Sequence, residues 1–518
     1  MPVPNQPGAL NASPRDVRRL WPSGNGSRAL PGTRFSNTAV SLFLLDMLLT
    51  LAAWIPVAAS LDPGAGAPGR PGFAVAVAAT FGFWLMFLYA LGLYRRDAMM
   101  GLRRSMARTP LAAGLAGLAA WGTTEAACLT FGIPLPAGNG WAATLFSAAT
   151  VCFVLCATTA RVGFAMLVEA RAFKRRLLVV GAGQRAHDLT VRISAESSSF
   201  QDEVIFVHHP ALGERLDSLG CAPGRTVLDA PAFDILRIAR DNDVHQIIVA
   251  PDERRGMPMQ NLLECKKAGF PIVQYLSFIE RETRRIDLAR FDLSWALYSD
   301  GFRFGMIDQM VKRAFDLAAS LAILALGSPF LAAGALAVRL GGPGPVLYRQ
   351  ERVTRDGRPF NILKLRTMRV DAEAGGAAWA KANDSRVTPV GHILRRTRVD
   401  ELPQLFNVLR GDMSIVGPRP ERPVFIADLV REIPLYNERH MMKAGLTGWA
   451  QVNYPYGASV EDARNKLSYD LYYVKNFSVI LDVLILVQTL RVVFWPAGAA
   501  KAHSEPVAHA DTPSPMKA

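Results

Sequence analysis

The sequence predicts a membrane protein made of three parts: a bundle of four transmembrane helices, an α/β domain, and an α+β domain with one further apolar helix. Three observations predict this fold class. Apolar runs of membrane length are concentrated at the front of the chain. Short buried strands alternate with helical stretches in the middle. A last apolar run, interrupted by a proline, precedes a segment dense in Arg, Asp and Gly.

The composition agrees with a chain of mixed character. The 518 residues are 50% hydrophobic and 20% charged, with a mean hydropathy of +0.16. These values exclude a disordered or collagen-like chain. The net charge of +14 indicates a polyanionic neighbour, which is nucleic acid, a phosphorylated substrate or an anionic lipid surface.

The first part of the chain predicts a disordered N-terminus over 1–36 and a membrane bundle over 37–168. Its four apolar runs cover residues 38–61, 73–94, 109–133 and 141–160. Arginines flank this region before the first run, between the second and third, and after the fourth, so both ends of the bundle are expected in the cytoplasm. Asp46 and Glu125 fall within apolar runs, and either a functional role or a pairing role between helices is open.

The middle part, 169–300, begins with a buried strand at 177–180 and a Gly181-Ala182-Gly183 turn of the form G-x-G-x-x-A. Further strands are expected at 204–207, 246–250 and 272–275, with helices near 233–242 and 259–268. The alternation predicts a Rossmann-like parallel sheet. Nucleotide binding at the helix N-terminus is one interpretation. A module that binds nothing is the other, because the second strand ends in His208 and not in an acidic residue.

An apolar segment at 312–340 is long enough to span a bilayer but contains Ser328-Pro329 near its centre. Proline removes a backbone hydrogen bond and clashes with the preceding turn. Basic residues flank both ends of the segment. A helix that enters the membrane, breaks and returns leaves both flanks in the cytoplasm, so we expect a re-entrant helix in which Ser328 helps to satisfy the freed backbone groups.

The remaining segment carries paired carboxylates and many arginines. Asp400-Glu401 precede a helix that is expected to start at Leu402-Pro403. Taken without the flanking segments, an aspartate at position 400 is explained as the N-cap of the following helix. Carboxylates can also form covalent phosphoryl intermediates and bind Mg²⁺, while arginines bind phosphate in pairs of hydrogen bonds. The surrounding blocks run from Leu363 to Met368, from Asp384 to Gly391, from Arg395 to Leu409, from Gly411 to Glu421, and from Lys443 to Asn453.

Together these blocks resemble the polyprenyl-phosphate hexose-1-phosphate transferases, the large monotopic phosphoglycosyl transferases of the bacterial sugar transferase family. The resemblance implies a catalytic domain over 308–496. It implies that Asp400 is the nucleophile and that Glu401 is its partner, both beside Mg²⁺. The residues that it places against substrates are Arg395, Arg396, Arg419, Lys364, Arg366 and Arg386, with Ser328 and Pro329 at the lipid phosphate. Arg398-Val399 departs from the Ser-Leu of many members and adds a cation beside the site.

The implied reaction transfers a hexose-1-phosphate from a UDP-hexose to undecaprenyl phosphate at the cytoplasmic face of the bacterial inner membrane, which initiates exopolysaccharide or other surface-glycan synthesis. The segment 275–303 resembles members associated with exosortase-linked exopolysaccharide clusters. Membrane lipids are expected partners, nucleic acid is not, and a homodimer is left open. The alternatives are a membrane-anchored nucleotide-sugar modifying enzyme, disfavoured because no Tyr-x-x-x-Lys pair occurs in the sequence, and a non-catalytic polysaccharide assembly protein.

Two C-terminal segments complete the sequence. The apolar run at 477–495 contains Asp482 and Arg491, and we interpret it as a helix at the membrane interface, because charges suit a surface position better than the bilayer core. Residues 497–518 are rich in Ala, Pro, Ser and His and are expected to be disordered.

Overall fold

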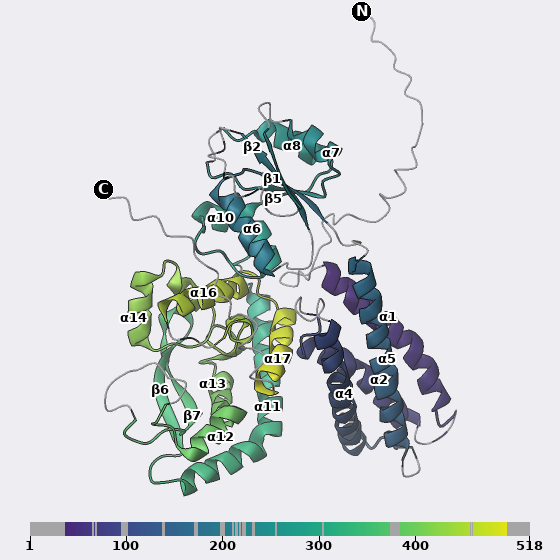
Figure 1. The fold of residues 1–518 in the computed structure, drawn as a ribbon. Helices are drawn as coiled ribbons and strands as arrows, with labels where there is room; N and C mark the ends of the chain where they lie inside the picture. Colours follow the sequence, from purple (N-terminus) through teal and green to yellow (C-terminus); the bar gives the residue numbers. More distant parts are fainter. Residues whose placement is uncertain are drawn as a thin grey trace, which may run out of the picture. The chain divides into compact units, whose positions relative to one another are not determined.

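The computed structural model describes residues 37–494, apart from 65–66, 68–69, 95–101, 137–139, 170–174, 197–201, 210–211, 213–215, 217–218, 220–223, 230–233, 254–255, 303–304, 373–383, 456 and 458. The disorder predicted for 1–36 and 497–518 lies outside the described residues. Residues 175–191 and 202–278 belong to one compact unit, and the bundle and residues 279–494 belong to the other (Figure 1).

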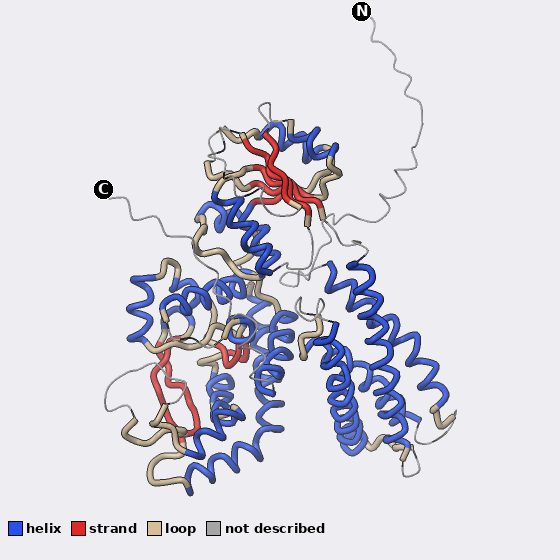
Figure 2. Tube along the Cα trace, viewed as in Figure 1, coloured by secondary structure: helices blue, strands red, loops and turns tan. Residues whose placement is uncertain are grey.

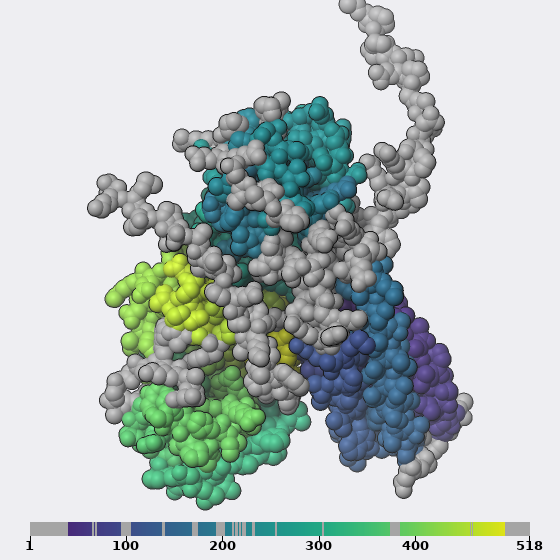
Figure 3. All heavy atoms as spheres, in the orientation of Figure 1, coloured from purple at the N-terminus to yellow at the C-terminus, as the bar shows by residue number. Residues whose placement is uncertain are grey.

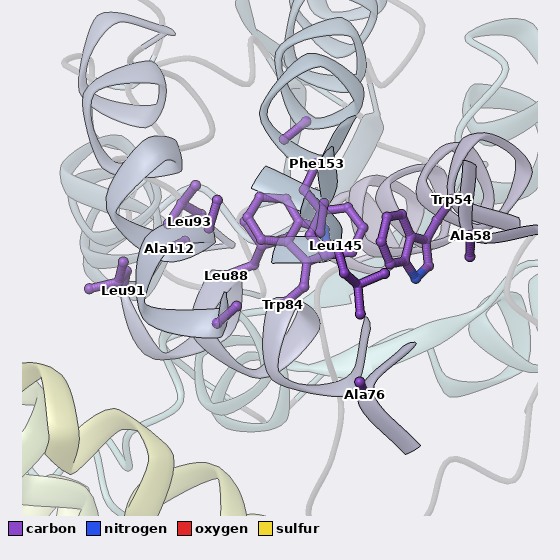
Figure 4. Close-up of a cluster of buried hydrophobic side chains, with 14 of the residues drawn as sticks. Trp54, Ala58, Ala76, Trp84, Leu88, Leu91, Leu93, Ala112, Leu145 and Phe153 are labelled. Carbon is purple, nitrogen blue, oxygen red and sulfur yellow. The ribbon is translucent and has the colours of Figure 1, made fainter. Parts of the chain in front are cut away.

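The front of the chain forms four helices, as predicted. They are α1 (Asn37–Ser60), α2 (Arg70–Ala90), α4 (Leu102–Phe131) and α5 (Trp141–Glu169). In the space-filling view α1, α5 and α4, coloured purple to blue, pack side by side (Figure 3). The bundle core is aromatic: Phe153 stacks on Trp84 with ring centroids 5.1 Å apart and meets Trp54 edge-on at 5.2 Å (Figure 4). Such aromatic contacts hold α1, α2 and α5 together.

Four helices in the described ranges are long and apolar enough to cross a membrane: α1, α2, α5 and the later α11 (Met306–Leu340). The protein is therefore a membrane protein. The third predicted span, α4, is not among them, because even beyond the arginines of its first turns it contains Glu125 and several Gly and Thr residues that lower its hydropathy. It joins the bundle through small residues, since Ala112 and Ala116 are fully buried against the core.

The charge inside the bundle is paired. Asp46 is completely buried, its Oδ1 lies 2.6 Å from Arg161 Nη1 of α5, and its Oδ2 accepts a hydrogen bond from the Tyr94 hydroxyl at 2.9 Å. Arg161 Nε donates to Ser105 Oγ of α4 at 2.9 Å. The pairing role is thus the one that the structure gives to Asp46, and it joins three helices of the bundle.

The middle domain contains a five-stranded parallel sheet in the order β3-β2-β1-β4-β5 (Figure 2). Its strands are β1 (Arg176–Val180), β2 (Glu203–His208), β3 (Arg225–Asp229), β4 (Gln246–Val249) and β5 (Ile272–Gln274), and its helices are α6 (Gln184–Glu196), α7 (Ile235–Asp241) and α8 (Met259–Lys267). The predicted parallel sheet is confirmed. The sequence did not predict β3, because only Val227 and Leu228 of this strand are apolar. Nucleotide binding by this domain stays a prediction.

The C-terminal part, 275–494, mixes helices with two small sheets. Its helices are α9 (Tyr275–Thr283), α10 (Leu293–Tyr298), α11, α12 (Pro389–Thr397), α13 (Gln404–Arg410), α14 (Pro423–Glu432), α15 (Trp449–Asn453), α16 (Val460–Lys475) and α17 (Val479–Phe494), with 3-10 turns η4 (Arg355–Gly357), η5 (Val399–Glu401) and η6 (Tyr436–Met441). The strands β6 (Leu347–Val353) and β7 (Pro359–Leu365) form an antiparallel hairpin, and β8 (Ser414–Val416) pairs in parallel with β9 (Gly445–Thr447).

Helix α11 is continuous through Pro329, where the sequence predicts a break, and it bends along its length (Figure 1). A proline at this position frees the carbonyl of Ala325, and the Ser328 hydroxyl donates to that oxygen at 3.0 Å. The helix therefore bends and does not end, because the lost backbone bond is replaced locally. The expected contribution of Ser328 is confirmed, and the re-entrant arrangement stays a prediction.

The polar residues at the start of α11 and in α17 face each other. Lys312 Nζ lies 2.7 Å from Asp482 Oδ2, and Asp482 Oδ1 accepts from the Tyr473 hydroxyl at 2.7 Å. Asp482 is fully buried. The surface position expected for Asp482 is therefore wrong, because the side chain is buried and neutralised by Lys312.

Candidate active site

The candidate site is built on the turn between α12 and α13. Arg398 ends α12 in the left-handed backbone region, with φ of 59°. The chain then passes through η5, which leaves Asp400 only 7% exposed. Left-handed backbone is uncommon for residues other than glycine and costs on the order of 1–3 kcal/mol, so the surrounding structure must hold this turn. The turn points the Asp400 carboxylate into the protein, whereas the carboxylate of an N-cap residue would point towards the first turn of the helix.

Three cations converge on Glu401. Its Oε1 lies 3.2 Å from Arg398 Nη1, 3.4 Å from Lys364 Nζ and 3.8 Å from Arg419 Nη2. Burial alone raises the pKa of Glu401, but the charges of Lys364, Arg419 and Arg398 outweigh it and lower the pKa to about 2. Burial lowers the pKa of Lys364, and the charge of Glu401 opposes that effect. Glu401 is therefore ionised throughout the physiological range.

Asp400 lies in a different environment from its neighbour. Its Oδ1 is buried and has no hydrogen-bond partner within the described part of the chain. Burial, and then the negative charge of Glu401, raises the pKa of Asp400 to about 6, and Lys364, Arg398 and Arg395 oppose the rise. No capping bond to α13 accompanies Asp400, and Pro403 is the N-cap residue, so the N-cap interpretation is wrong. Two adjacent carboxylates with separated pKa values are typical of a catalytic pair.

Two of the predicted arginines are held beside this pair by residues that the sequence analysis did not single out. Arg395 Nε donates to Thr367 Oγ1 at 3.0 Å, and Arg419 Nη1 donates to Gln451 Oε1 at 3.1 Å. Both partners belong to blocks that were recognised as a whole. Each bond fixes the orientation of a guanidinium group, and an oriented guanidinium group is suited to bind phosphate.

The other predicted arginines either bond to groups outside the carboxylate pair or are exposed. Arg366 donates to the carbonyls of Pro343 at 2.5 Å and Gly342 at 3.0 Å, which follow the end of α11. Arg386 pairs with Asp384 within its own turn at 2.5 Å. Arg396 is exposed in the last turn of α12. Phosphate binding by these three arginines stays a prediction.

Ser328 and Pro329 are exposed at the bend of α11. The preceding residue, Gly327, faces the catalytic turn, because a Cβ atom built there would lie 3.3 Å from Leu402 Cδ1. The bend of the apolar helix and the carboxylate pair are therefore neighbours. This placement agrees with the predicted contact between Ser328-Pro329 and a lipid phosphate and does not test it.

The carboxylate pair fits Mg²⁺ as a partly protein-held ion. Asp400 Oδ1 is a buried oxygen without a hydrogen-bond partner, and Glu401 is ionised. Across the described ranges no group of three or more His, Cys, Asp or Glu residues gathers as a metal cage. Mg²⁺ is commonly bound by one or two carboxylates together with substrate phosphates and water, so these two side chains are a suitable protein share of its ligands.

The fold and the site define a class of protein: a membrane protein whose ionised and buried carboxylates lie among cations beside an apolar helix. The family model of the bacterial sugar transferases matches residues 307–496. A UDP-N-acetylgalactosamine-undecaprenyl-phosphate N-acetylgalactosaminephosphotransferase of Aeromonas hydrophila is 40% identical over 303 residues, 58% of this chain and 67% of the relative. An exopolysaccharide production protein of Rhizobium leguminosarum is 44% identical over 190 residues, 36% of this chain and 95% of the relative.

A UDP-glucose:undecaprenyl-phosphate glucose-1-phosphate transferase of Escherichia coli is 43% identical over 186 residues, 36% of this chain and 40% of that protein. The chain belongs to the bacterial sugar transferase family. The match to the Aeromonas protein extends beyond the family range, so the similarity is not confined to the C-terminal domain.

Proposed function

We propose that the protein transfers a sugar-1-phosphate from a UDP-sugar to undecaprenyl phosphate through a covalent phospho-aspartate at Asp400. The observation that carries this proposal is the contrast between two adjacent carboxylates. Asp400 is buried, and its Oδ1 has no hydrogen-bond partner among the described residues, which raises its pKa, whereas Glu401 is held by three cations, which lower its pKa. A buried carboxylate that is poorly solvated when ionised is a reactive nucleophile, and the cations around it suit a diphosphate. The names of the relatives supply the donor and acceptor classes.

In the first half-reaction, ionised Asp400 attacks the β-phosphorus of the donor. A bond forms between the carboxylate oxygen and phosphorus, and the bond from phosphorus to the bridging oxygen breaks. UMP leaves with that oxygen, so no proton transfer is required of Asp400. Arg395 and Arg419, each fixed by one hydrogen bond, are positioned to hold the phosphates, and Lys364 and Arg398 balance the developing negative charge.

In the second half-reaction, a phosphate oxygen of the lipid attacks the same phosphorus. The bond between phosphorus and Asp400 breaks, which regenerates the carboxylate and yields a lipid-linked diphospho-sugar. Ser328 and Pro329, which follow Gly327 in the part of α11 that faces Leu402, are proposed to contact the lipid phosphate. When bound by Asp400 and Glu401, Mg²⁺ supplies charge neutralisation for the phosphates.

The sugar and the location are part of the proposal. The relatives are named for N-acetylgalactosamine and for glucose, so UDP-N-acetylgalactosamine and UDP-glucose are candidate donors. The arginines that flank the bundle favour an inner-membrane protein with its C-terminal domain in the cytoplasm, where UDP-sugars occur. An exopolysaccharide or other surface glycan is the proposed product pathway.

The test is UMP release by the full chain in detergent with Mg²⁺ and a panel of UDP-sugars, with and without undecaprenyl phosphate. We expect release with one of these donors and loss of release in Asp400→Asn, while Arg410→Ala, an exposed change in the last turn of α13, retains activity. Lipid-linked sugar made at the wild-type rate by Asp400→Asn would overturn the nucleophile. No release with any donor would favour a non-catalytic assembly protein.

A further inference from the structure

We propose that Gly334 of α11 is a positioning residue, which sets the spacing of the three segments that carry Lys364, Arg395 and Asp400. This inference rests on the proposed function of that site. Gly334 is buried in the second half of α11, five residues after Pro329. Glycine in a helix interior is unfavourable relative to alanine, so its presence here needs a packing reason.

The packing reason is a three-sided contact. A Cβ atom built on Gly334 would lie 3.0 Å from Leu365 Cδ1, 3.2 Å from Leu394 Cδ2 and 3.2 Å from Val399 Cγ1. All three distances are shorter than ordinary van der Waals contacts, so a methyl group would displace these side chains by a few tenths of an ångström. The absence of a side chain at this position allows three segments to approach α11 at the same point.

Each of the three contacting residues is next in sequence to a residue of the site. Leu365 at the end of β7 follows Lys364, Leu394 of α12 precedes Arg395, and Val399 of η5 precedes Asp400. Leu365 and Leu394 belong to one buried cluster with Val338 of α11, and Val399 packs against it. A displacement at Gly334 therefore reaches the nucleophile and two cations together.

The cluster also joins the site to the apolar helix. Gly334 follows the bend at Pro329, and Gly327 before the bend contacts Leu402. Helix α11 therefore contacts the catalytic turn both before and after its bend at Pro329. The geometry of Asp400 then depends on the path of the same helix that is apolar enough to cross a membrane.

The test compares Gly334→Ala with Ala333→Val, an exposed change one residue away on the same helix. We expect Gly334→Ala to lower the kcat of UMP release about tenfold with KM for the UDP-sugar changed less than about twofold, since a misplacement of about 1 Å can cost about 10²-fold. Ala333→Val is expected to retain activity. Because alanine favours the helix, the thermal unfolding temperature of Gly334→Ala is expected to fall little.

A rescue variant separates positioning from damage to the fold. Leu365→Val shortens the side chain nearest to the new methyl group, so Leu365→Val with Gly334→Ala is expected to recover activity relative to Gly334→Ala alone. Wild-type kcat in Gly334→Ala, or no recovery in the double variant, would overturn the inference. If the wild-type protein itself releases no UMP, the proposed function fails instead.

A different observation, in the middle domain, carries a second inference: we infer that Asp252 occupies the anion site of the glycine turn, so the domain holds no phosphate there. The backbone N–H of Gln184 donates to Asp252 Oδ2 at 2.5 Å, and that of Arg185 donates to Oδ1 at 2.8 Å. These donors at the start of α6 are the ones that a nucleotide phosphate would use. One carboxylate already satisfies both.

The glycine turn is also covered by the loop that carries Asp252. A Cβ atom at Gly181 would lie 2.5 Å from the carbonyl oxygen of Ala250, and Arg185 Nη1 donates to the carbonyl of Pro251 at 3.3 Å. The backbone of 250–252 therefore packs directly against the glycine turn and holds Asp252 at the start of α6. An occupied anion site agrees with the lack of an acidic ribose ligand at the end of β2.

The test is anion rescue of thermal stability in the full-length protein. We expect Asp252→Ala to lower the unfolding temperature by about 2–8 °C, the shift expected for a lost helix cap, and inorganic phosphate to restore at least half of that loss. The control is Asp234→Ala, because Asp234 caps α7 by accepting from Arg237 N at 3.3 Å and phosphate should not replace it. Stabilisation of the wild-type protein by phosphate or NADH to the same extent, or an unchanged Asp252→Ala, would overturn the inference.

Discussion

The pKa of Asp400 predicts how the first half-reaction depends on pH. With a pKa of about 6, Asp400 is about nine-tenths ionised at pH 7 and about one-tenth ionised at pH 5. Because the attacking form is the carboxylate, UMP release should fall about tenfold between these pH values. An Asp400 at its ordinary pKa of 3.8 would stay more than about nine-tenths ionised at pH 5 and would give almost no change.

A substitution at Lys364 shifts the same profile in a defined direction. Lys364 is the largest of the charges that lower the pKa of Asp400, so Lys364→Met should raise that pKa, by about one unit if the effect is typical of a nearby opposite charge. The variant should then be about half as active as its own plateau at pH 7 and should reach that plateau near pH 8.5.

The assay is single-turnover UMP release without lipid acceptor, so that titration of the lipid phosphate does not contribute. Circular dichroism at each pH checks that the protein stays folded, and Arg410→Ala is the matched loss of an exposed cation. A flat wild-type profile from pH 5 to 7, or a shift of the Lys364→Met profile to lower pH, would refute the account of Asp400.

Three further predictions concern stability. Asp46→Asn should destabilise the bundle by about 3–5 kcal/mol, because it leaves Arg161 buried without its counter-charge, and a thermal melt in detergent measures the loss. Asp482→Asn should also destabilise the protein, because Lys312 keeps only the more distant Asp316 carboxylate at 3.8 Å, and replacing Lys312 by Met together with Asp482 by Leu should recover much of the loss in the same melt. Asn407→Ala should cost about 1–3 kcal/mol in denaturant unfolding, because fully buried Asn407 bonds the backbone of β7; an unchanged midpoint would contradict this.

The sequence predicts those features that depend on one period or one local motif. Apolar runs located the bundle helices, and alternating strands predicted the parallel sheet, because such periodic patterns are local and can be read from one sequence. Strand β3 was missed because only Val227 and Leu228 are apolar, and its place comes from pairing with β2. The break at Pro329 became a bend because the Ser328 hydroxyl takes over one bond.

The candidate site was likewise predicted only in part from the sequence. Asp400, Glu401 and the flanking cations came from recognisable blocks, and the structure brings Lys364, Arg398 and Arg419 to one carboxylate oxygen. The left-handed turn at Arg398 and the support of Arg419 by Gln451 depend on contacts between distant segments. Such contacts have no signature in a single sequence.

The Asp46–Arg161 pair bears on the order in which the chain is assembled during synthesis. It joins the first helix of the bundle to the last, and more than a hundred residues separate the two partners. An aspartate in the bilayer without its partner is unfavourable, so α1 is a poor membrane anchor until α5 has been made. The bundle is therefore expected to close late, as one event, and its last helix completes the insertion of its first.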